Sequence, residues 1–435
     1  MSTPSLTRLS LAVAICGLLA LPALADSQVR IVRLSDVQGS VQIDKNSGSG
    51  FENAFLNLPV TQGSKVRTGD NGRAEVEFED GSTVRLAPNT EVDFSTLGLS
   101  DSGKRTSQVN LVEGMAYVNW LGKDDFTFNF AREVAVLDRG AHFRADVSAD
   151  VANLAVFKGE VPLEGPSGKL TVEKKKTVTF NAADDEKYTL ANKIVEAPLD
   201  SWDKESISYH DAYAKNNNSS PYGYGLSDLN YYGAYTNVPG YGMMWQPYFT
   251  GIGWDPFMNG AWGWYPGFGF MYASAYPWGW LPYRYGNWMF VPGFGWMWQP
   301  GGWNTWMAVP RYTPTTLVHV NAPIPPAATS TKTVVVGTAV ATSALRSRVT
   351  VNEGSAGLGI PRGSFSNLSH LNHQVAKTGF AEVRPAPQFS GSSPKGSSGF
   401  GESRGSGASH SSMAAPAMGH ASTAGHASTG GTSHH

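Results

Sequence analysis

The sequence predicts a mainly β protein, in which a sandwich or solenoid-like β domain precedes one connecting helix, a region of aromatic hairpin repeats and a disordered C-terminal tail. Three observations support this prediction. Apolar and polar side chains alternate at period two through residues 26–196, as half-buried strands require. An aromatic motif then recurs about every 26 residues through residues 222–312. Finally, residues 385–435 are mostly Gly, Ser, Ala and His, with few large apolar groups to offset the entropy of ordering.

Residues 1–25 have the pattern of a secretory signal peptide. Arg8 precedes an apolar stretch over residues 9–21, and residues 23–25 form a small-x-small cleavage site. A permanent membrane helix needs about 20 apolar residues, and this stretch breaks earlier, at Pro22, so cleavage is favoured. We therefore expect a mature chain that begins near Asp26, has no membrane span and is periplasmic or secreted, in the cell envelope.

The cysteine and charge content excludes several classes of function. Cys16 is the one cysteine, so the mature chain is expected to lack a thiol nucleophile, a disulfide and a thiolate metal ligand. Cys16 could instead accept a lipid, but lipoprotein signals usually carry a small residue where this chain has Ile15. The chain has 33 basic and 35 acidic residues, a net charge of -2, which gives no electrostatic footprint for nucleic acid.

The clearest strand signal is a hairpin over residues 74–86. Apolar residues alternate with three glutamates up to Glu79, and Asp80-Gly81 follows, a dipeptide that tolerates the positive φ values of tight turns. The alternation then resumes around Arg85. Further runs of this kind recur between turns later in the domain, so many short strands are expected.

The stretch from Val66 to Phe94, VRTGDNGRAEVEFEDGSTVRLAPNTEVDF, resembles the FecR domain family. Gly69, Gly72 and Gly81 occupy the turn glycines of that family, and residues 111–118 and 156–163 are similar to its later strand repeats. The resemblance implies an all-β extracytoplasmic domain. The best-known members are membrane-spanning regulators that relay iron-siderophore uptake to a sigma factor. This chain shows neither a cytoplasmic segment before the signal nor a persistent membrane helix, so direct sigma-factor control is not expected.

Residues 197–221 predict the connecting helix and a linker. Asp200 and Ser201 are good N-cap residues, and Trp202, Tyr209 and Tyr213 follow at spacings that fit one helical face. Such an aromatic stripe is more often a packing face than a ligand site. We expect this helix to close or cover the β domain.

Residues 222–312 are rich in aromatic residues and nearly free of charge. Eleven of the thirteen tryptophans lie between Trp245 and Trp306, and a Pro-Gly-aromatic-Gly motif begins at Pro239, Pro266 and Pro292. A Pro-Gly turn between short aromatic runs suits stacked hairpins. The rings either form the core of this region or remain partly exposed as platforms for a partner, and both can hold together.

The candidate contact residues for such a partner are seven tryptophans of the repeat region. They are Trp262, Trp264, Trp278, Trp280, Trp288, Trp296 and Trp298. Together with residues 359–364, this region resembles a C-terminal arrangement that accompanies FecR domains in envelope proteins of unassigned function.

Residues 313–384 are expected to be a Pro/Thr/Ala-rich linker with a short ordered segment, and residues 385–435 a disordered tail. The polar patch over residues 364–373 suits a short helix. His370 and His373 have metal-like spacing, but no third ligand is near them, and no carboxylate or cysteine completes a site with the tail histidines. No metal and no cofactor are therefore expected.

No catalytic constellation stands out. The GxSxG match at residues 401–405 lies in the tail, where a strained nucleophile elbow cannot form, and His142 with Asp138 is a pair without a nucleophile. We therefore expect a non-enzymatic envelope protein that acts as a protein-binding, scaffolding or signal-receiving module. The alternative is binding of a cell-wall polysaccharide or exopolysaccharide through the aromatic repeats.

Overall fold

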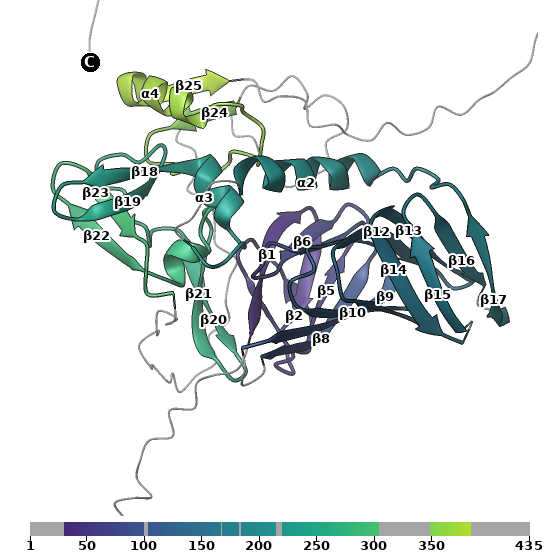
Figure 1. Ribbon diagram of the computed structural model, residues 1–435. Helices are drawn as coiled ribbons and strands as arrows, with labels where there is room; N and C mark the ends of the chain where they lie inside the picture. Colours follow the sequence, from purple (N-terminus) through teal and green to yellow (C-terminus); the bar gives the residue numbers. More distant parts are fainter. Residues whose placement is uncertain are drawn as a thin grey trace, which may run out of the picture. The chain divides into compact units, whose positions relative to one another are not determined.

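The computed structural model describes residues 30–99, 103–166, 168–181, 184–214, 220–303 and 349–383 (Figure 1). The predicted signal peptide, most of the predicted linker and the predicted tail lie outside these ranges. The described chain is mainly β, as predicted, with α2 (Asp200–Tyr213), α3 (Leu226–Tyr232), α4 (Leu368–Thr378) and the short 3-10 helix η1 (Leu281–Tyr283). In this described part of the chain, no helix is long and apolar enough to cross a membrane.

Residues 31–191 form two sheets that share one long strand, β9 (Arg105–Trp120). Sheet A runs in the order β4 (Pro59–Thr61), β1 (Ile31–Gln38), β6 (Arg73–Glu77), β7 (Thr83–Leu86), β9, β12 (Ala141–Val147), β13 (Val151–Lys158), β16 (Thr177–Asn181), β17 (Asp184–Ala191). Sheet B runs in the order β3 (Glu52–Asn53), β2 (Val41–Asp44), β5 (Ser64–Thr68), β8 (Glu91–Leu99), β9, β10 (Asp125–Phe130), β11 (Glu133–Leu137), β14 (Glu160–Gly165), β15 (Gly168–Glu173).

Strand β9 changes sheets at Gly114. Glu113 pairs with β8 in sheet B, whereas Gly114 pairs with β12 in sheet A. The backbone of Gly114 has φ 84°, and a Cβ there would lie 2.3 Å from the carbonyl oxygen of Asn89. A residue with a side chain would therefore be strained and would clash, so glycine is required at this bend.

The two sheets pack face to face through apolar side chains. Phe78, which follows β6, contacts Phe94 of β8 and Phe126 of β10. At the other side of the interface, Phe143 of β12 contacts Phe128 of β10. The β domain is therefore a sandwich, one of the two predicted alternatives.

The predicted hairpin is confirmed, because β6 pairs with β7 in the register Glu77↔Thr83 and Ala74↔Leu86. Its glutamates are not in solvent, however. Glu75 and Glu77 on the outer face of sheet A are each 1% exposed. Helix α2 lies across this face (Figure 1), and α3 also contacts it. Period-two alternation predicts which side chains share a face, but it carries no information on whether another layer covers that face.

Helix α2 begins at Asp200, and its N-cap residue is Leu199, which makes no side-chain capping bond. The predicted caps Asp200 and Ser201 thus lie inside the helix. The Asp200 carboxylate instead accepts hydrogen bonds from Arg144 and the Tyr117 hydroxyl of the β domain. The stripe of aromatic residues on α2 is a packing face, since Trp202 and Tyr209 are each 8% exposed.

The aromatic region contains three hairpins, one at each Pro-Gly-aromatic-Gly motif. They are β18 (Gly233–Val238) with β19 (Gly242–Pro247), β20 (Gly260–Tyr265) with β21 (Gly269–Ser274), and β22 (Asn287–Val291) with β23 (Gly295–Gln299). In the first turn, Tyr241 donates its N–H to the Val238 carbonyl, and Gly240 and Gly242 have φ of 81° and 79°. Proline at the second position and a positive-φ glycine at the third suit a type II turn, which explains the repeated motif.

Each hairpin also buries one aromatic side chain whose polar tip binds a backbone carbonyl of the preceding segment. Trp245 donates to the Leu229 carbonyl at 3.1 Å, and Trp298 donates to the Tyr285 carbonyl at 2.7 Å. The equivalent residue of the second hairpin, Tyr272, donates to the Phe257 carbonyl at 3.3 Å. In each repeat this one buried donor is satisfied, whereas the buried Tyr265 hydroxyl and the Trp288 indole N–H of the second and third hairpins have no hydrogen-bond partner among the described residues.

The first and third hairpins join in one four-stranded sheet through the pair Trp245↔Trp298. Two glutamine side chains, one from each hairpin, donate hydrogen bonds to the other hairpin. Gln246 donates to the Phe294 carbonyl at 2.7 Å, and Gln299 donates to the Tyr241 carbonyl at 3.0 Å. The second hairpin has Ala273 at the position of these glutamines and forms a separate two-stranded sheet.

In residues 349–383, β24 (Val349–Asn352) pairs with β25 (Phe380–Val383), and α4 lies between these strands in the sequence. A helix does form at the predicted polar patch, with Asn367 as N-cap accepting from the His370 N–H. This segment binds the aromatic region directly. Trp278 donates to the Ala356 carbonyl, and the Tyr232 hydroxyl donates to the Ile360 carbonyl, both at 2.7 Å.

Candidate functional site

The seven candidate tryptophans fall into two groups. Trp262 and Trp264 on β20 are 45% and 36% exposed, and Trp288 and Trp296 are half-buried. The remaining three are fully buried: Trp278, Trp280 and Trp298. The first group can contact a partner, whereas the second cannot in this structure.

Ring contacts connect Trp262 to Trp288 through Phe257 and two buried tyrosines, Tyr272 and Tyr283. Trp262 contacts Tyr272 with ring centroids 5.3 Å apart, and Tyr272 contacts Phe257 at 5.8 Å. Tyr283 lies 5.5 Å from Phe257 and 6.0 Å from Trp288. Hairpin two, the loop before it and hairpin three are therefore joined by aromatic packing.

The surface continues along hairpin three. Phe290 follows Trp288 by two residues on β22, so both side chains point to the same face of the strand. Phe290 also contacts Trp296 across the hairpin, at 5.9 Å. We call this surface the aromatic face and define it by Phe257, Trp262, Trp264, Trp288, Phe290 and Trp296.

Trp278 lies beneath the aromatic face and supports it. Its ring is stacked near Tyr283 at 5.9 Å and contacts Trp288 at 5.8 Å. The expectation that Trp278, Trp280 and Trp298 contact a ligand is corrected here, because each has 0% exposure. Rings of this size that are packed on all sides, like Trp278 with its indole N–H bonded to a carbonyl, belong to the core.

Sequence reasoning missed two members of the aromatic face, Phe257 and Phe290, which are 47% and 62% exposed. A signal for Phe290 was present, because it alternates with Trp288 at period two in a strand. No periodicity could place Phe257, since it lies in the irregular loop before β20.

The aromatic face exposes a large apolar area for four side chains. With about 200 Å² per aromatic side chain, Phe257, Trp262, Trp264 and Phe290 expose roughly 400 Å² together. Exposed apolar area of this extent often marks an interaction site. The aromatic face is therefore the strongest candidate contact surface in the described chain.

The region that carries this face offers almost no charge to a ligand. Among residues 222–303, Asp228 and Arg284 are buried, which leaves Asp255 as the one partly exposed acidic or basic side chain. Recognition here must therefore use shape, apolar contact and neutral hydrogen bonds.

A buried charge network attaches the aromatic region to the β domain. Arg33 of β1 contacts Asp228 of α3 at 2.6 Å and Glu77 of β6 at 3.2 Å. Arg362, from the C-terminal segment, contacts the same Asp228 at 2.7 Å and Glu75 of β6 at 2.9 Å. Two arginines and three carboxylates thus connect three separate parts of the chain.

Glu75 is the most heavily bonded carboxylate of this network. It accepts from Arg85 at 2.8 Å, from Ser35 at 2.7 Å and pairs with His210 at 3.0 Å. Burial alone would raise the pKa of Glu75, but His210, Arg85 and Arg362 hold it well below its usual value. Glu75 is therefore ionised and holds its partners through its negative charge.

Glu77 behaves in the opposite way. Burial raises the pKa of Glu77, His210 and Arg33 only partly offset this, and the nearby charges of Asp228 and Glu75 add to the rise. Two neighbouring carboxylates on one strand face thus differ in how well their negative charge is compensated.

His142 does not pair with Asp138, the residue considered in the sequence analysis. Its imidazole pairs with Asp203 of α2 at 2.7 Å, whereas Asp138 is 73% exposed and pairs with Arg139. Asp203 also accepts from Arg85 at 2.9 Å. His142 therefore helps to hold α2 on sheet A.

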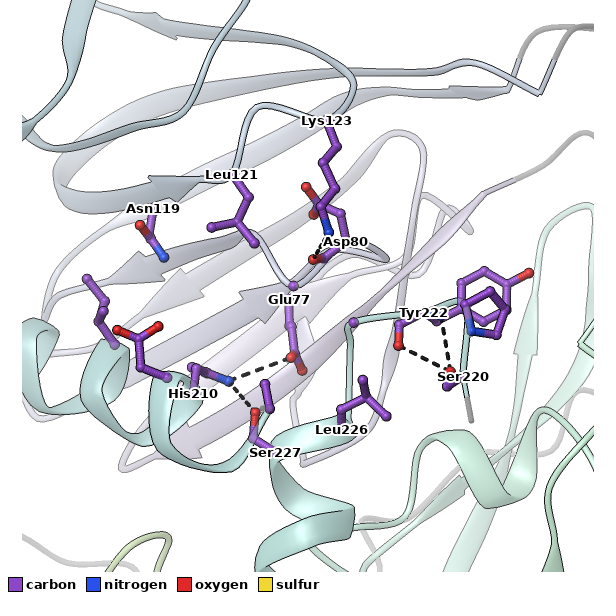
Figure 2. Close-up of a pocket in the computed structure, with 16 residues that line it drawn as sticks. Glu77, Asp80, Asn119, Leu121, Lys123, His210, Ser220, Tyr222, Leu226 and Ser227 are labelled. Atoms are coloured by element: carbon purple, nitrogen blue, oxygen red, sulfur yellow. Dashed lines mark hydrogen bonds and ion pairs between the residues drawn. The ribbon is translucent and has the colours of Figure 1, made fainter. Parts of the chain in front are cut away.

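A pocket of about 310 Å³ lies beside this network (Figure 2). The end of β6, the end of β9, helix α2 and the start of α3 surround it, and its polar lining includes Glu77, Asn119, Lys123 and His210. No sequence motif marks it, because its residues come from four distant segments. Within the described ranges, no three potential ligands are grouped to hold a metal ion.

Replacing the two glutamates should separate their roles. Glu75→Gln leaves Arg85, Arg362 and His210 without their shared carboxylate, so we expect a loss of about 3–5 kcal/mol in the free energy of unfolding. Glu77→Gln should cost clearly less, about 1 kcal/mol, because its ionised form is poorly compensated. Urea unfolding at pH 7 measures both, with the fully exposed Glu173→Gln as control. Equal losses for Glu75 and Glu77 would contradict this assignment.

The lowered pKa values of Glu75 and Asp228 make the free energy of unfolding depend on pH in the acidic range. A carboxyl whose pKa is lower in the folded state stabilises the fold above its unfolded pKa, and this stabilisation is lost as the pH falls. We expect the free energy of unfolding to decrease below about pH 4.5, and Glu75→Gln to flatten that decrease. Urea unfolding at several pH values tests this, and an unchanged slope in the variant would refute it.

Two regions of the chain match known protein families. Residues 64–162 match the family described as FecR protein, and residues 226–326 match a family of unknown function, DUF6600. Two crystal structures of a "putative anti-sigma factor" from Parabacteroides distasonis ATCC 8503 align at 17% identity and TM-score 0.28, over 34% of this chain and 71% and 72% of theirs. A search of curated proteins found no match. The family match confirms the predicted resemblance, and residues 64–162 therefore carry a FecR domain.

Proposed function

We propose that this protein is a non-enzymatic, exported envelope module that binds a partner protein through the aromatic face. The FecR domain and the C-terminal segment form the support on which that face is presented. In this role the protein receives a signal from its partner or holds an envelope assembly together.

Export is proposed on the sequence of residues 1–25 alone, with its basic start, apolar stretch and small-residue cleavage site. The FecR domain is consistent with such a location, because the resemblance implies an extracytoplasmic domain.

The single observation that carries the proposal is the set of exposed aromatic side chains on this uncharged aromatic face. Tryptophan and tyrosine are enriched among the residues that dominate the binding energy of protein interfaces. Packing also makes the face rigid. Trp278 packs beneath it, and Gln246 donates a hydrogen bond to the hairpin that carries Phe290. A pre-organised surface loses less conformational entropy on binding, which favours specific contact.

One observation favours the polysaccharide alternative. Trp262 and Trp264 lie two residues apart on one face of β20, about 7 Å apart along the strand, so two rings are available to stack on a saccharide. The partner's chemistry therefore needs a test in which protein and glycan give different results.

The test is site-specific cross-linking in intact cells. A photo-reactive phenylalanine analogue at Phe290 should give a discrete protein adduct, because this side chain lies on the contact surface. The same analogue at Val136, which is 51% exposed on strand β11 of the FecR domain, is the matched control and should give none. Mass spectrometry identifies the adduct, and cell fractionation in the same experiment locates the protein.

Identical adduct patterns at the two positions, or none at Phe290, would refute a protein partner at this face. A glycan array separates the alternative, because binding that is lost in the Trp262→Ala, Trp264→Ala double variant would assign the face to polysaccharide. Recovery of the uncleaved chain in the cytosol would refute export.

A further inference from the structure

The pocket beside the charge network combines an acidic floor with apolar walls (Figure 2). Its apolar lining comes from both sides of the junction between the FecR domain and the helices. These apolar residues are Leu121, Ile207, Ala214, Pro221 and Leu226. Glu77 and Asp211 provide carboxyl groups, and a volume of about 310 Å³ suits a small molecule.

Glu77 is the unusual group in this pocket. Its Oε2 atom accepts from the Gly225 N–H at 3.0 Å and from Arg33 at 3.2 Å. Its Oε1 atom accepts no hydrogen bond from the described residues, and the Nδ1 atom of His210, 3.8 Å away, is instead bonded to Ser227 at 2.7 Å. The Glu77 side chain as a whole is 1% exposed, but Oε1 is not among the fully buried atoms without a partner in the described residues, so this oxygen keeps some accessible surface.

Such an acceptor is open to a further donor. A carboxylate oxygen that borders a pocket and accepts no hydrogen bond from the protein can be completed by a water, an ion or a ligand. Because Oε1 belongs to a residue that lines the pocket, a donor that enters the pocket can reach it.

The surrounding charges decide which kind of donor fits. The carboxylates of Glu75, Glu77, Asp203 and Asp228 are ion-paired with three arginines, Arg33, Arg85 and Arg362. His210 also pairs with Glu75 and Glu77, and His142 pairs with Asp203. Burial raises the pKa of Glu77, and His210 and Arg33 offset this rise only partly. A cationic donor at Glu77 would add to this compensation.

We propose that this pocket binds a small aliphatic amine, whose ammonium group donates to Glu77 Oε1 while its methylene chain contacts the apolar walls. Asp211, the residue after His210 on α2, adds a second negative charge to the same pocket. Lys123, the one lysine of the lining, is engaged with the Asp80 carbonyl at 3.4 Å. This site is independent of the aromatic face.

Isothermal titration of the full mature chain with putrescine tests the proposal, with 1,4-butanediol as the uncharged ligand of equal length. Putrescine should bind and butanediol should not. Glu77→Gln should weaken putrescine binding at least about tenfold, since a charge-assisted hydrogen bond is lost, and Asp211→Asn should weaken it several-fold. Glu164→Gln, an exposed glutamate on β14 paired with Lys169, is the matched control and should change nothing.

Three results would overturn the proposal. These are no binding of putrescine, cadaverine or spermidine at millimolar concentration, equal binding of putrescine and butanediol, or unchanged affinity in both pocket variants. If Glu77→Gln does not fold, as judged by circular dichroism, Asp211→Asn decides, because Asp211 is exposed and its replacement leaves the buried network intact.

Discussion

The architecture depends on a set of charges that are buried on the outer face of sheet A. A β-sandwich needs only its inner faces to be apolar, and an outer face with Arg33, Glu75 and Glu77 would normally point to water. Here α2, α3 and residues around Arg362 cover that face, and each charge finds a partner from another part of the chain. Breaking one buried pair leaves an uncompensated charge, so these contacts fix how the layers dock.

The aromatic region packs its hairpins together with almost no charged side chains. Each hairpin buries a ring whose polar tip binds a carbonyl of the preceding segment, so the region folds around large side chains and satisfies one buried donor in each hairpin. Hairpins one and three then hold each other through Gln246 and Gln299. The second hairpin lacks this glutamine, and its strand β20 instead presents Trp262 and Trp264 outward.

Much of this fold was predictable from local pattern. The alternation around Glu75 gave the hairpin β6–β7, and the Pro-Gly motifs located all three aromatic turns, because both signals are local in sequence. The burial of Glu75 and Glu77 was not predictable, since their covering residues, such as His210 and Arg362, lie 135 and 287 positions away. For the same reason the sequence could not separate the exposed Trp262 from the buried Trp278. Both lie in equally aromatic surroundings, and Trp278 is buried by distant parts of the chain, such as Trp245 and Ala356.

The central claim is that buried ion pairs dock the aromatic region and the C-terminal segment onto the FecR domain as one cooperative unit. A double-mutant cycle on Asp228→Asn and Arg362→Gln, followed by urea unfolding, tests it most directly. We expect a coupling energy of about 1–3 kcal/mol and a single unfolding transition in the unmodified protein. Additive effects of the two substitutions, with separate transitions for the FecR domain and the aromatic region, would contradict it.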